Sequence, residues 1–280
     1  MFPHESPEFP YDEHAMGQDE LLQCTHLLIV ATRSEQEQLA RAATDLGLPF
    51  AERKGRTTTY FDLGAAGPGR VLALRTAEGP FSFGGSAAQA IYSRLETQAV
   101  GGMIGVGTCF GVDRATQAVG DVIVSSALVP YDNRNVLSDG LLPRFRYHRV
   151  TRHPAKASLR AMLERSRDAD ARDFKVHFGA LLSGGSHIAC RSYRDHLVSM
   201  LTKVAEDTIV GGEMEGVGLL GLSARDRPEW VVVKGISDFA DEDRATDAPA
   251  HRERASYHAA RFVLEALQAE RSRVAQEASP

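Results

Sequence analysis

The stretch that decides the fold is residues 230–241, which read WVVVKGISDFAD. Its apolar run predicts a buried strand, which we expect to stop at Gly235 and then present Ser237 and Asp238. In open α/β sheets, ligands bind at the carboxyl ends of the strands. A carboxyl group held there by a rigid strand is partly desolvated, which favours its protonated form.

A second acidic junction lies upstream, where residues 211–216 read GGEMEG. We expect Glu213 and Glu215 to stand between a strand and a helix there. Two acidic junctions in one chain predict acid–base chemistry on a small ligand.

Strand-like and helix-like segments alternate along the rest of the chain. Strands are expected at 26–31, 101–106, 122–128 and 174–182, a hairpin at 57–63 and 70–75, and helices at 34–46 (with Ser34 as N-cap), 87–99, 154–165, 193–202, 214–224 and 251–270. The polar, arginine-rich stretch 132–153 is expected to be a long functional or interface loop. The alternation predicts an α/β fold, a single domain with a central mixed twisted β-sheet flanked by helices. We expect a flexible N-terminal arm at 1–24, this domain at 25–272 and a tail at 273–280.

Composition limits the possible partners. The chain has 280 residues, 43% of them hydrophobic, and a formal net charge of -5 without a basic stripe, which argues against nucleic acid. The arginine-rich stretches 144–152 and 252–254 are mixed with histidine and acid, so we expect solvated surface there.

Cys24, Cys109 and Cys190 are odd in number and widely spaced, which favours reduced thiols over a disulfide framework or a metal site. No apolar run approaches the roughly 20 residues of a membrane span. The first residues lack an apolar signal core. We therefore expect a cytoplasmic location, no membrane partner, no metal and no cofactor.

Five motifs occur in order: ATRSE at 31–35, GVGTCFG at 105–111, LSGGSHI at 182–188, EMEG at 213–216, and ISD at 236–238 followed by AD at 240–241. With them the chain resembles the nucleoside phosphorylase and nucleosidase superfamily from about 26 to 267. It looks most like the methylthioadenosine/S-adenosylhomocysteine nucleosidase branch, and also like nucleosidase-like domains joined to signalling or defence modules. The resemblance implies a nucleoside phosphorylase-like fold and cleavage of a purine N-glycosidic bond.

Breaking that bond leaves an oxocarbenium-like sugar and an anionic base, so an acid must protonate the departing base. The resemblance gives this task to Asp238, acting on the purine N7 and oriented by Ser237. General acid catalysis typically contributes about 10²–10⁴-fold. The alternative for Asp238 is a helix N-cap.

Glu35 follows the first strand in the spacing of the family's water-activating glutamate, so the resemblance makes it the general base. One acid and one base would then share a hydrolysis, as in glycosidases. The alternatives are Glu37 as the base, or Glu35 as a solvated first-turn glutamate favoured by the helix dipole.

The resemblance assigns the ribose 2′ and 3′ hydroxyls to Glu215, with Met214 along the sugar face. Met214 could instead pack in the core. Glu213 is either a supporting carboxylate or a surface charge. Lys234 stands where nucleosidases often carry arginine, and it could tether Glu215 or another carboxylate.

The remaining expected contacts surround the base. Residues 105–111 resemble the family's ribose and water loop, here with Thr108, Cys109 and Phe110. Phe110 could narrow the pocket or stack on the base, whereas Cys109 is expected to be a packing residue rather than a nucleophile. His187 and Ile188 fall where the family places an aromatic and an aliphatic residue against the purine, and His187 could also simply cap the rim.

The expected function is hydrolysis of a purine nucleoside or nucleotide, with adenine as the base. The phosphorylase signature Gly-Asp-Pro-x-Arg is absent after the first strand, yet Arg33, Arg56 and Arg75 could meet phosphate on a substrate such as AMP or ATP. A purine nucleoside phosphorylase and a non-catalytic nucleotide sensor are the alternatives; no Gly-x-Gly-x-x-Gly supports a dehydrogenase. The resemblance also implies a homodimer or higher homo-oligomer, in which 132–153 could complete a neighbouring pocket.

Overall fold

A computed structural model describes residues 22–56, 58–79, 85–86, 89, 93, 96–97, 99–139, 142–147, 150–168, 172–222, 229–243 and 249–278. Residues 1–21 of the expected N-terminal arm and most of the helix expected at 87–99 lie outside these residues, while Cys24, at the end of the expected arm, is buried.

The strands form one mixed sheet in the order β11-β10-β6-β12-β5-β1-β4-β3-β2. Strand β12 pairs in parallel with β5 and antiparallel with β6, so both directions meet at its centre. The bounds are β1 His26–Val30, β2 Ala51–Lys54, β3 Thr59–Asp62, β4 Val71–Arg75, β5 Gly102–Gly111, β6 Val122–Pro130, β10 Val176–Ser183, β11 Ile209–Glu213 and β12 Trp230–Asp238. The expected mixed α/β fold is confirmed.

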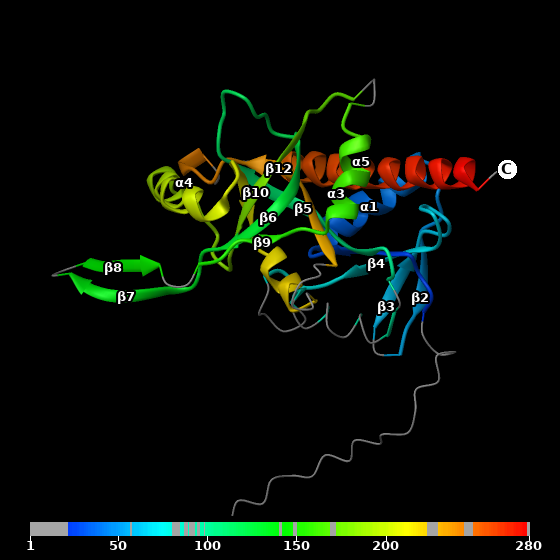
Figure 1. The fold of residues 1–280 in the computed structure, drawn as a ribbon, viewed down its shortest axis with the longest axis horizontal. Helices are drawn as coiled ribbons and strands as arrows, with labels where there is room; N and C mark the ends of the chain where they lie inside the picture. The colour runs from blue at the N-terminus through cyan, green and yellow to red at the C-terminus, as the bar shows by residue number, and fades with distance from the viewer. Residues whose placement is uncertain are drawn as a thin grey trace, which may run out of the picture.

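The helices are α1 Arg33–Asp45, α3 Ala157–Arg165, α4 Arg191–Ala205 and α5 Pro249–Glu277. Helix α5 lies against β12 and β5 and beside α1 and α3 (Figure 1). Its contact with β12 is very close at one point, because a Cβ built on Gly235 would lie 2.0 Å from the Ala255 carbonyl oxygen. Because Gly235 has no side chain, α5 packs directly on β12, the strand that ends at Asp238.

The two central strands are longer than expected. Strand β12 continues through Gly235 to Asp238, and β5 continues to Gly111, so residues 105–111 are not a loop. The reason is pairing on both sides of β5: Lys234 lies opposite Gly107 and Asp238 opposite Phe110, while β11 joins the far end. Gly235 therefore provides room for α5 instead of ending the strand.

The prediction of a long irregular loop at 132–153 is wrong. Strands β7 Arg134–Asp139 and β8 Leu142–Tyr147 form an antiparallel hairpin that projects from the sheet, and β9 His153–Pro154 pairs with β6 (Figure 1). Charged residues on a solvated hairpin resemble loop composition, which is why the polar sequence was misleading.

Several helix ends also differ. Thr32, not Ser34, is the N-cap of α1, since its hydroxyl accepts from the Glu35 amide. Residues Gly216–Leu222 form a short 3-10 helix, η2, in place of the α-helix expected at 214–224, because the Glu213 carboxylate takes the first amides of that segment. Helix α3 begins at Ala157, and α5 runs on to Glu277, through most of the expected tail.

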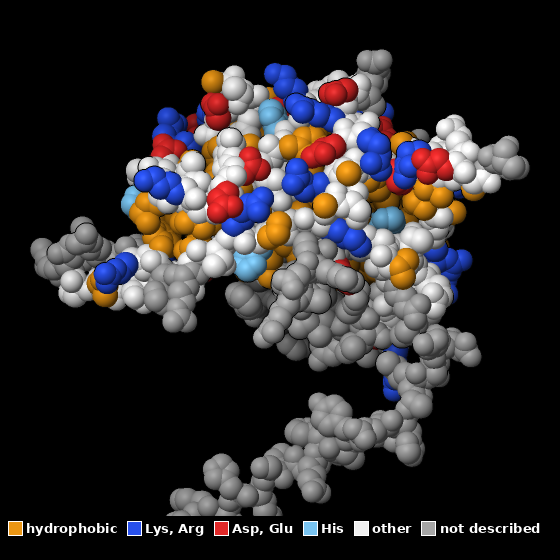
Figure 2. Space-filling model, in the orientation of Figure 1, with side chains coloured by type: hydrophobic (Ala, Val, Ile, Leu, Met, Phe, Trp, Pro, Cys, Tyr) orange, Lys and Arg blue, Asp and Glu red, His pale blue; other side chains and the backbone are white. Residues whose placement is uncertain are grey.

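The surface of the described residues carries mixed charge, as the sequence predicts. Lys and Arg side chains alternate with Asp and Glu across the face drawn in Figure 2, without a continuous basic stripe among the coloured residues. In the described part of the chain, no helix is long and apolar enough to cross a membrane.

Candidate active site

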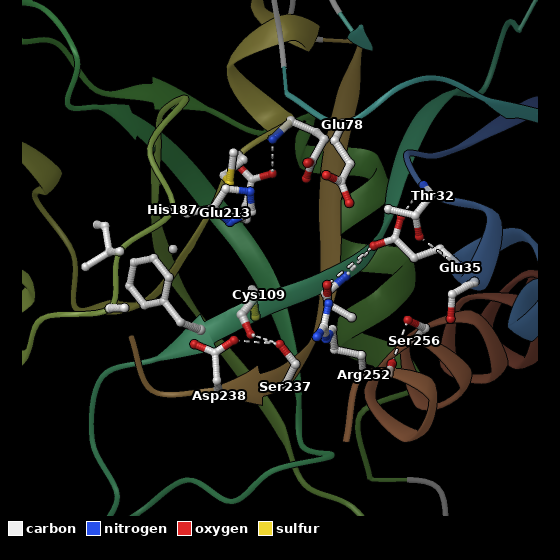
Figure 3. A pocket seen from close by; sticks show the side chains of 18 of the residues that line it. Thr32, Glu35, Glu78, Cys109, His187, Glu213, Ser237, Asp238, Arg252 and Ser256 are labelled. Atoms are coloured by element: carbon white, nitrogen blue, oxygen red, sulfur yellow. Dashed lines mark hydrogen bonds between the residues drawn. The ribbon is translucent and has the colours of Figure 1, made fainter. Parts of the chain in front are cut away.

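A cavity of about 730 Å³ opens where β5, β11 and β12 end and α1 and α5 begin (Figure 3). This volume lies within the range of roughly 300–1,000 Å³ that is typical of small-molecule sites. Every predicted site residue except Lys234 lines it: Glu35, Thr108, Cys109, Phe110, His187, Ile188, Glu213, Met214, Glu215, Ser237 and Asp238. Lys234 lines a small adjoining pocket instead, and Glu213 and Glu215 line both this pocket and the cavity.

Asp238 is the last residue of β12 and is buried apart from 7% of its surface. Its Oδ2 lies 3.0 Å from the Ser237 hydroxyl, which also lies 3.2 Å from the Cys109 carbonyl oxygen. Its Oδ1 accepts a hydrogen bond from the Ala240 amide at 2.9 Å. Strand and turn together hold this carboxyl group at the cavity wall.

Glu35 is held at the start of α1 by both carboxylate oxygens. Oε2 accepts from the Ala31 and Thr32 amides at 2.8 and 3.1 Å, and Oε1 accepts from the Thr108 amide at 2.9 Å. Burial raises the pKa of Glu35, the negative charge of Glu215 adds to the rise, and Lys234 opposes it. Glu35 is thus both the capping-box glutamate of α1 and a buried carboxyl group facing the cavity.

Glu37, the alternative base, is not placed for that role. Its side chain is 56% exposed and pairs with Arg33 at 2.9 Å, and neither residue lines the cavity.

Glu215, Glu213 and Lys234 form a charge cluster at the sugar side. The Lys234 ammonium is buried and lies 3.0 Å from Glu215 Oε2 and 3.9 Å from Glu213 Oε2. Burial by itself would raise the pKa of Glu215, but the charge and hydrogen bond of Lys234 outweigh it and lower that pKa. Burial raises the pKa of Glu213. The tethering role expected for Lys234 is confirmed by this geometry.

Glu213 is a buried supporting group, not a surface charge. Its Oε2 accepts from the Glu215 and Gly216 amides at 3.0 and 2.7 Å, which fixes the turn that carries Glu215. Its Oε1 has no hydrogen-bond partner among the described residues. Met214, between the two carboxylates, is half-buried and faces the cavity instead of joining the core.

The opposite wall is more apolar. Phe110 packs against the backbone of β11, where a Cβ on Gly212 would lie 2.2 Å from its ring. Burial raises the pKa of the Cys109 thiol well above its usual value, which agrees with a packing role and not with a nucleophile. Ile188 is buried, whereas His187 is exposed at the rim.

Sequence reasoning missed the contribution of α5. Pro249, Arg252, Glu253 and Ser256 line the cavity, although 252–254 had been assigned to solvated surface. Further lining residues that were missed are Thr32, Ser34, Glu78, Ser186, Ala189 and Gly212. Arg33, Arg56 and Arg75, the expected phosphate contacts, are not among the lining residues. The described residues contain no group of three or more side chains arranged to hold a metal ion.

A sequence profile of the phosphorylase superfamily matches residues 25–268. The Death domain-containing ATP nucleosidase of Amphimedon queenslandica is 30% identical over 157 residues, which are 50% of this chain and 28% of that protein. The chain therefore spans well under two thirds of that relative's length.

Solved structures share the fold at low identity. The 5′-methylthioadenosine/S-adenosylhomocysteine nucleosidase of Helicobacter pylori, bound to butyl-thio-DADMe-Immucillin-A, has a TM-score of 0.69 and 16% identity over 89% of this chain and 99% of that one. The futalosine hydrolase of Helicobacter pylori has a TM-score of 0.67 and 18% identity over 89% and 98%.

Proposed function

Because the chain belongs to the phosphorylase superfamily, we propose that it hydrolyses the N-glycosidic bond of a purine nucleoside or nucleotide and releases adenine. One observation carries the proposal: a single cavity joins a buried strand-end acid, Asp238, to a buried carboxylate of raised pKa, Glu35. A nucleotide is included because the curated relative is an ATP nucleosidase, and a nucleoside because the similar solved structures include methylthioadenosine nucleosidases.

The start of α1 favours water over phosphate as the nucleophile. A helix N-terminus with free amides is a natural anion site. Here the Glu35 carboxylate already accepts from the amides of Ala31 and Thr32 and from Thr108 across the cavity. A phosphate ion would meet this carboxylate in place of open amides, whereas a water molecule could donate a proton to it.

In the proposed reaction, Asp238 gives its proton to the purine as the C–N bond breaks, and Ser237 keeps the carboxyl group oriented. Glu35 takes a proton from the attacking water, whose oxygen bonds to the anomeric carbon. The raised pKa of Glu35 makes it a stronger base than an exposed glutamate. Glu215, kept ionised by Lys234, accepts hydrogen bonds from the ribose hydroxyls.

Base release should be measured by chromatography on the full chain with adenosine, inosine, 5′-methylthioadenosine and adenine nucleotides, each with and without inorganic phosphate. We expect free adenine and a free sugar product at equal rates in both conditions. An absolute requirement for phosphate, with a sugar 1-phosphate as product, would overturn hydrolysis. The absence of base release from every substrate would overturn the enzyme assignment in favour of a nucleotide sensor.

A further inference from the structure

The cavity has a third side, formed by the first turns of α1 and α5, that the proposed chemistry does not use. Its lining residues are Thr32, Ser34, Pro249, Arg252, Glu253 and Ser256. Figure 3 shows Arg252 and Ser256 of α5 on the side of the cavity away from His187. In the same view, Asp238 lies at the lower left and Glu213, two residues before Glu215, at the upper left.

The geometry of ribose assigns this third side to the 5′ substituent. The base leaves from C1′ and the 5′ group from C4′, on either side of the ring oxygen, while the two hydroxyls occupy the opposite edge. A nucleoside with its base at Asp238 and its hydroxyls at Glu215 therefore directs C5′ toward the first turn of α5.

The side chains there are polar. Apart from Pro249, every described lining residue on this side carries a hydroxyl or a charge. Among the described residues of this wall, an alkylthio substituent would meet only one apolar side chain, Pro249, whereas a hydrated or charged group could form hydrogen bonds to Ser34 and Arg252. The wall therefore suits a polar 5′ group.

Arg252 determines which polar group fits best. Its guanidinium forms no ion pair with any described residue, while its neighbours on α5 are matched: Arg254 with Asp173 at 3.6 Å and Arg261 with Glu265 at 2.7 Å. The N-terminus of α5 adds partial positive charge on the same side, whereas that of α1 is already capped by the Glu35 carboxylate. Glu253 also lines the cavity, but it is separated from Arg252 by about 100° of helical rotation.

Resting on the proposed function, we propose that the substrate is a 5′-phosphorylated adenine nucleotide and that Arg252 binds its phosphate. A guanidinium can bind phosphate through two parallel hydrogen bonds, which a thioether or a 5′ hydroxyl cannot accept in the same way. Arg252 is then a specificity-determining residue of the cavity, at the opposite end of the substrate from Asp238.

The test compares kcat/KM for adenine release from AMP, ADP and ATP with the values for adenosine and 5′-methylthioadenosine, in the wild type and in Arg252→Gln. We expect the wild type to prefer at least one phosphorylated substrate. We expect Arg252→Gln to reduce the ratio of nucleotide to adenosine kcat/KM by about 10- to 100-fold, the loss of one charge-assisted contact. Arg252→Lys should restore part of this ratio, since it keeps the charge but not the paired donors.

Arg254→Gln is the matched control, because it removes an equal charge from the same turn without touching the cavity, and its ratio should equal that of the wild type. Equal or better turnover of adenosine and 5′-methylthioadenosine, with an unchanged ratio in Arg252→Gln, would overturn the nucleotide assignment while leaving base hydrolysis in place. Absence of base release from all five compounds would instead overturn the proposed function.

Discussion

Asp238 combines a fixed position with the role of proton donor that we propose for it. The Ser237 hydroxyl, itself positioned by the Cys109 carbonyl oxygen, and the Ala240 amide hold the Asp238 carboxyl group at the end of β12. Replacing Asp238 by Asn keeps the shape and removes the acid, so kcat for adenine release should fall by at least about 100-fold. Calorimetry should show a nearly unchanged substrate affinity.

Asp243→Asn is the control for that experiment, since Asp243 lies five residues further on and its side chain is 71% exposed. Its kcat should match that of the wild type. Turnover retained by Asp238→Asn would show that the acid is a different residue.

Glu35 should determine the acidic limb of the pH profile. A general base must be deprotonated, so kcat/KM falls as the pH drops through its pKa. Because burial raises that pKa, the fall should occur above the value of about 4.3 of an ordinary glutamate. When activity is measured across pH, the Glu35→Gln variant should lose most of the rate, and its remaining activity should show no acidic limb.

Lys234 lowers the pKa of both Glu35 and Glu215, so Lys234→Met should move the same limb to higher pH. It should also destabilise the fold by roughly 3–5 kcal/mol, since breaking a buried pair leaves an unpaired carboxylate. A limb at the wild-type pH in a folded Lys234→Met variant would contradict the charge coupling.

At the scale of elements, the contact between α5 and β12 depends on Gly235. In Gly235→Ala the new methyl group would lie 2.0 Å from the backbone oxygen of Ala255, so helix and strand must separate. We expect a loss of about 1–3 kcal/mol or more in the free energy of unfolding, measured with urea. Gly185→Ala is the control: its Cβ would lie 3.7 Å from the nearest neighbouring atom, Asp132 Oδ2, and the free energy of unfolding should stay within about 0.5 kcal/mol of the wild type.

Glu270 links α5 to α3 through Arg165 at 2.7 Å and also binds Arg273 on its own helix at 2.6 Å. These contacts lower its pKa to about 2, against the opposing effect of burial. A depressed carboxyl pKa stabilises the fold above the ordinary value and loses this effect as the pH falls through the folded-state value.

Glu270→Gln should therefore lower Tm at pH 7, by an amount worth at most about 1 kcal/mol because both arginines are partly exposed. The difference from the wild type should shrink as the pH falls from about 4.5 toward 2. Glu277→Gln, an exposed partner of the same Arg273, should show a smaller difference throughout. A difference in Tm between Glu270→Gln and the wild type that stays constant across pH would contradict stabilisation by the Glu270 charge.

At the scale of the whole molecule, the sequence predicted those parts of the fold and of the candidate site that depend on short, local patterns. The strand preceding Asp238 is a short apolar run, so the local pattern placed that carboxyl group at a strand end. Glu35 was selected by the motif spacing of the family resemblance, while its capping partner Thr32 was misassigned to Ser34. Arg252 was missed because its place at the cavity follows from α5 packing on Gly235, a contact that no local pattern records. The β7–β8 hairpin was missed because its cross-strand pairing leaves mostly polar side chains in solvent.

The association of chains stays a prediction at this scale. Val136 and Leu137, 65% and 42% exposed on the projecting hairpin, are apolar surface that a second copy could cover. Light scattering on the purified chain should report a dimer or larger assembly, and a monomer at all concentrations would contradict this. Val136→Asp should weaken the assembly, whereas Val274→Asp, which changes a 39% exposed valine on α5, should not.

The close contact at Gly235 has a further consequence for redesign. It fixes the position of α5 against β12, the strand that ends in Asp238, while the first turn of α5 lines the cavity. In the proposed reaction, the end of the site that carries the chemistry and the end that selects the substrate are thus joined through one backbone contact. A protein engineer could exchange side chains in that first turn to change the substrate preference that we propose, while leaving the sheet and the positions of Asp238 and Glu35 undisturbed.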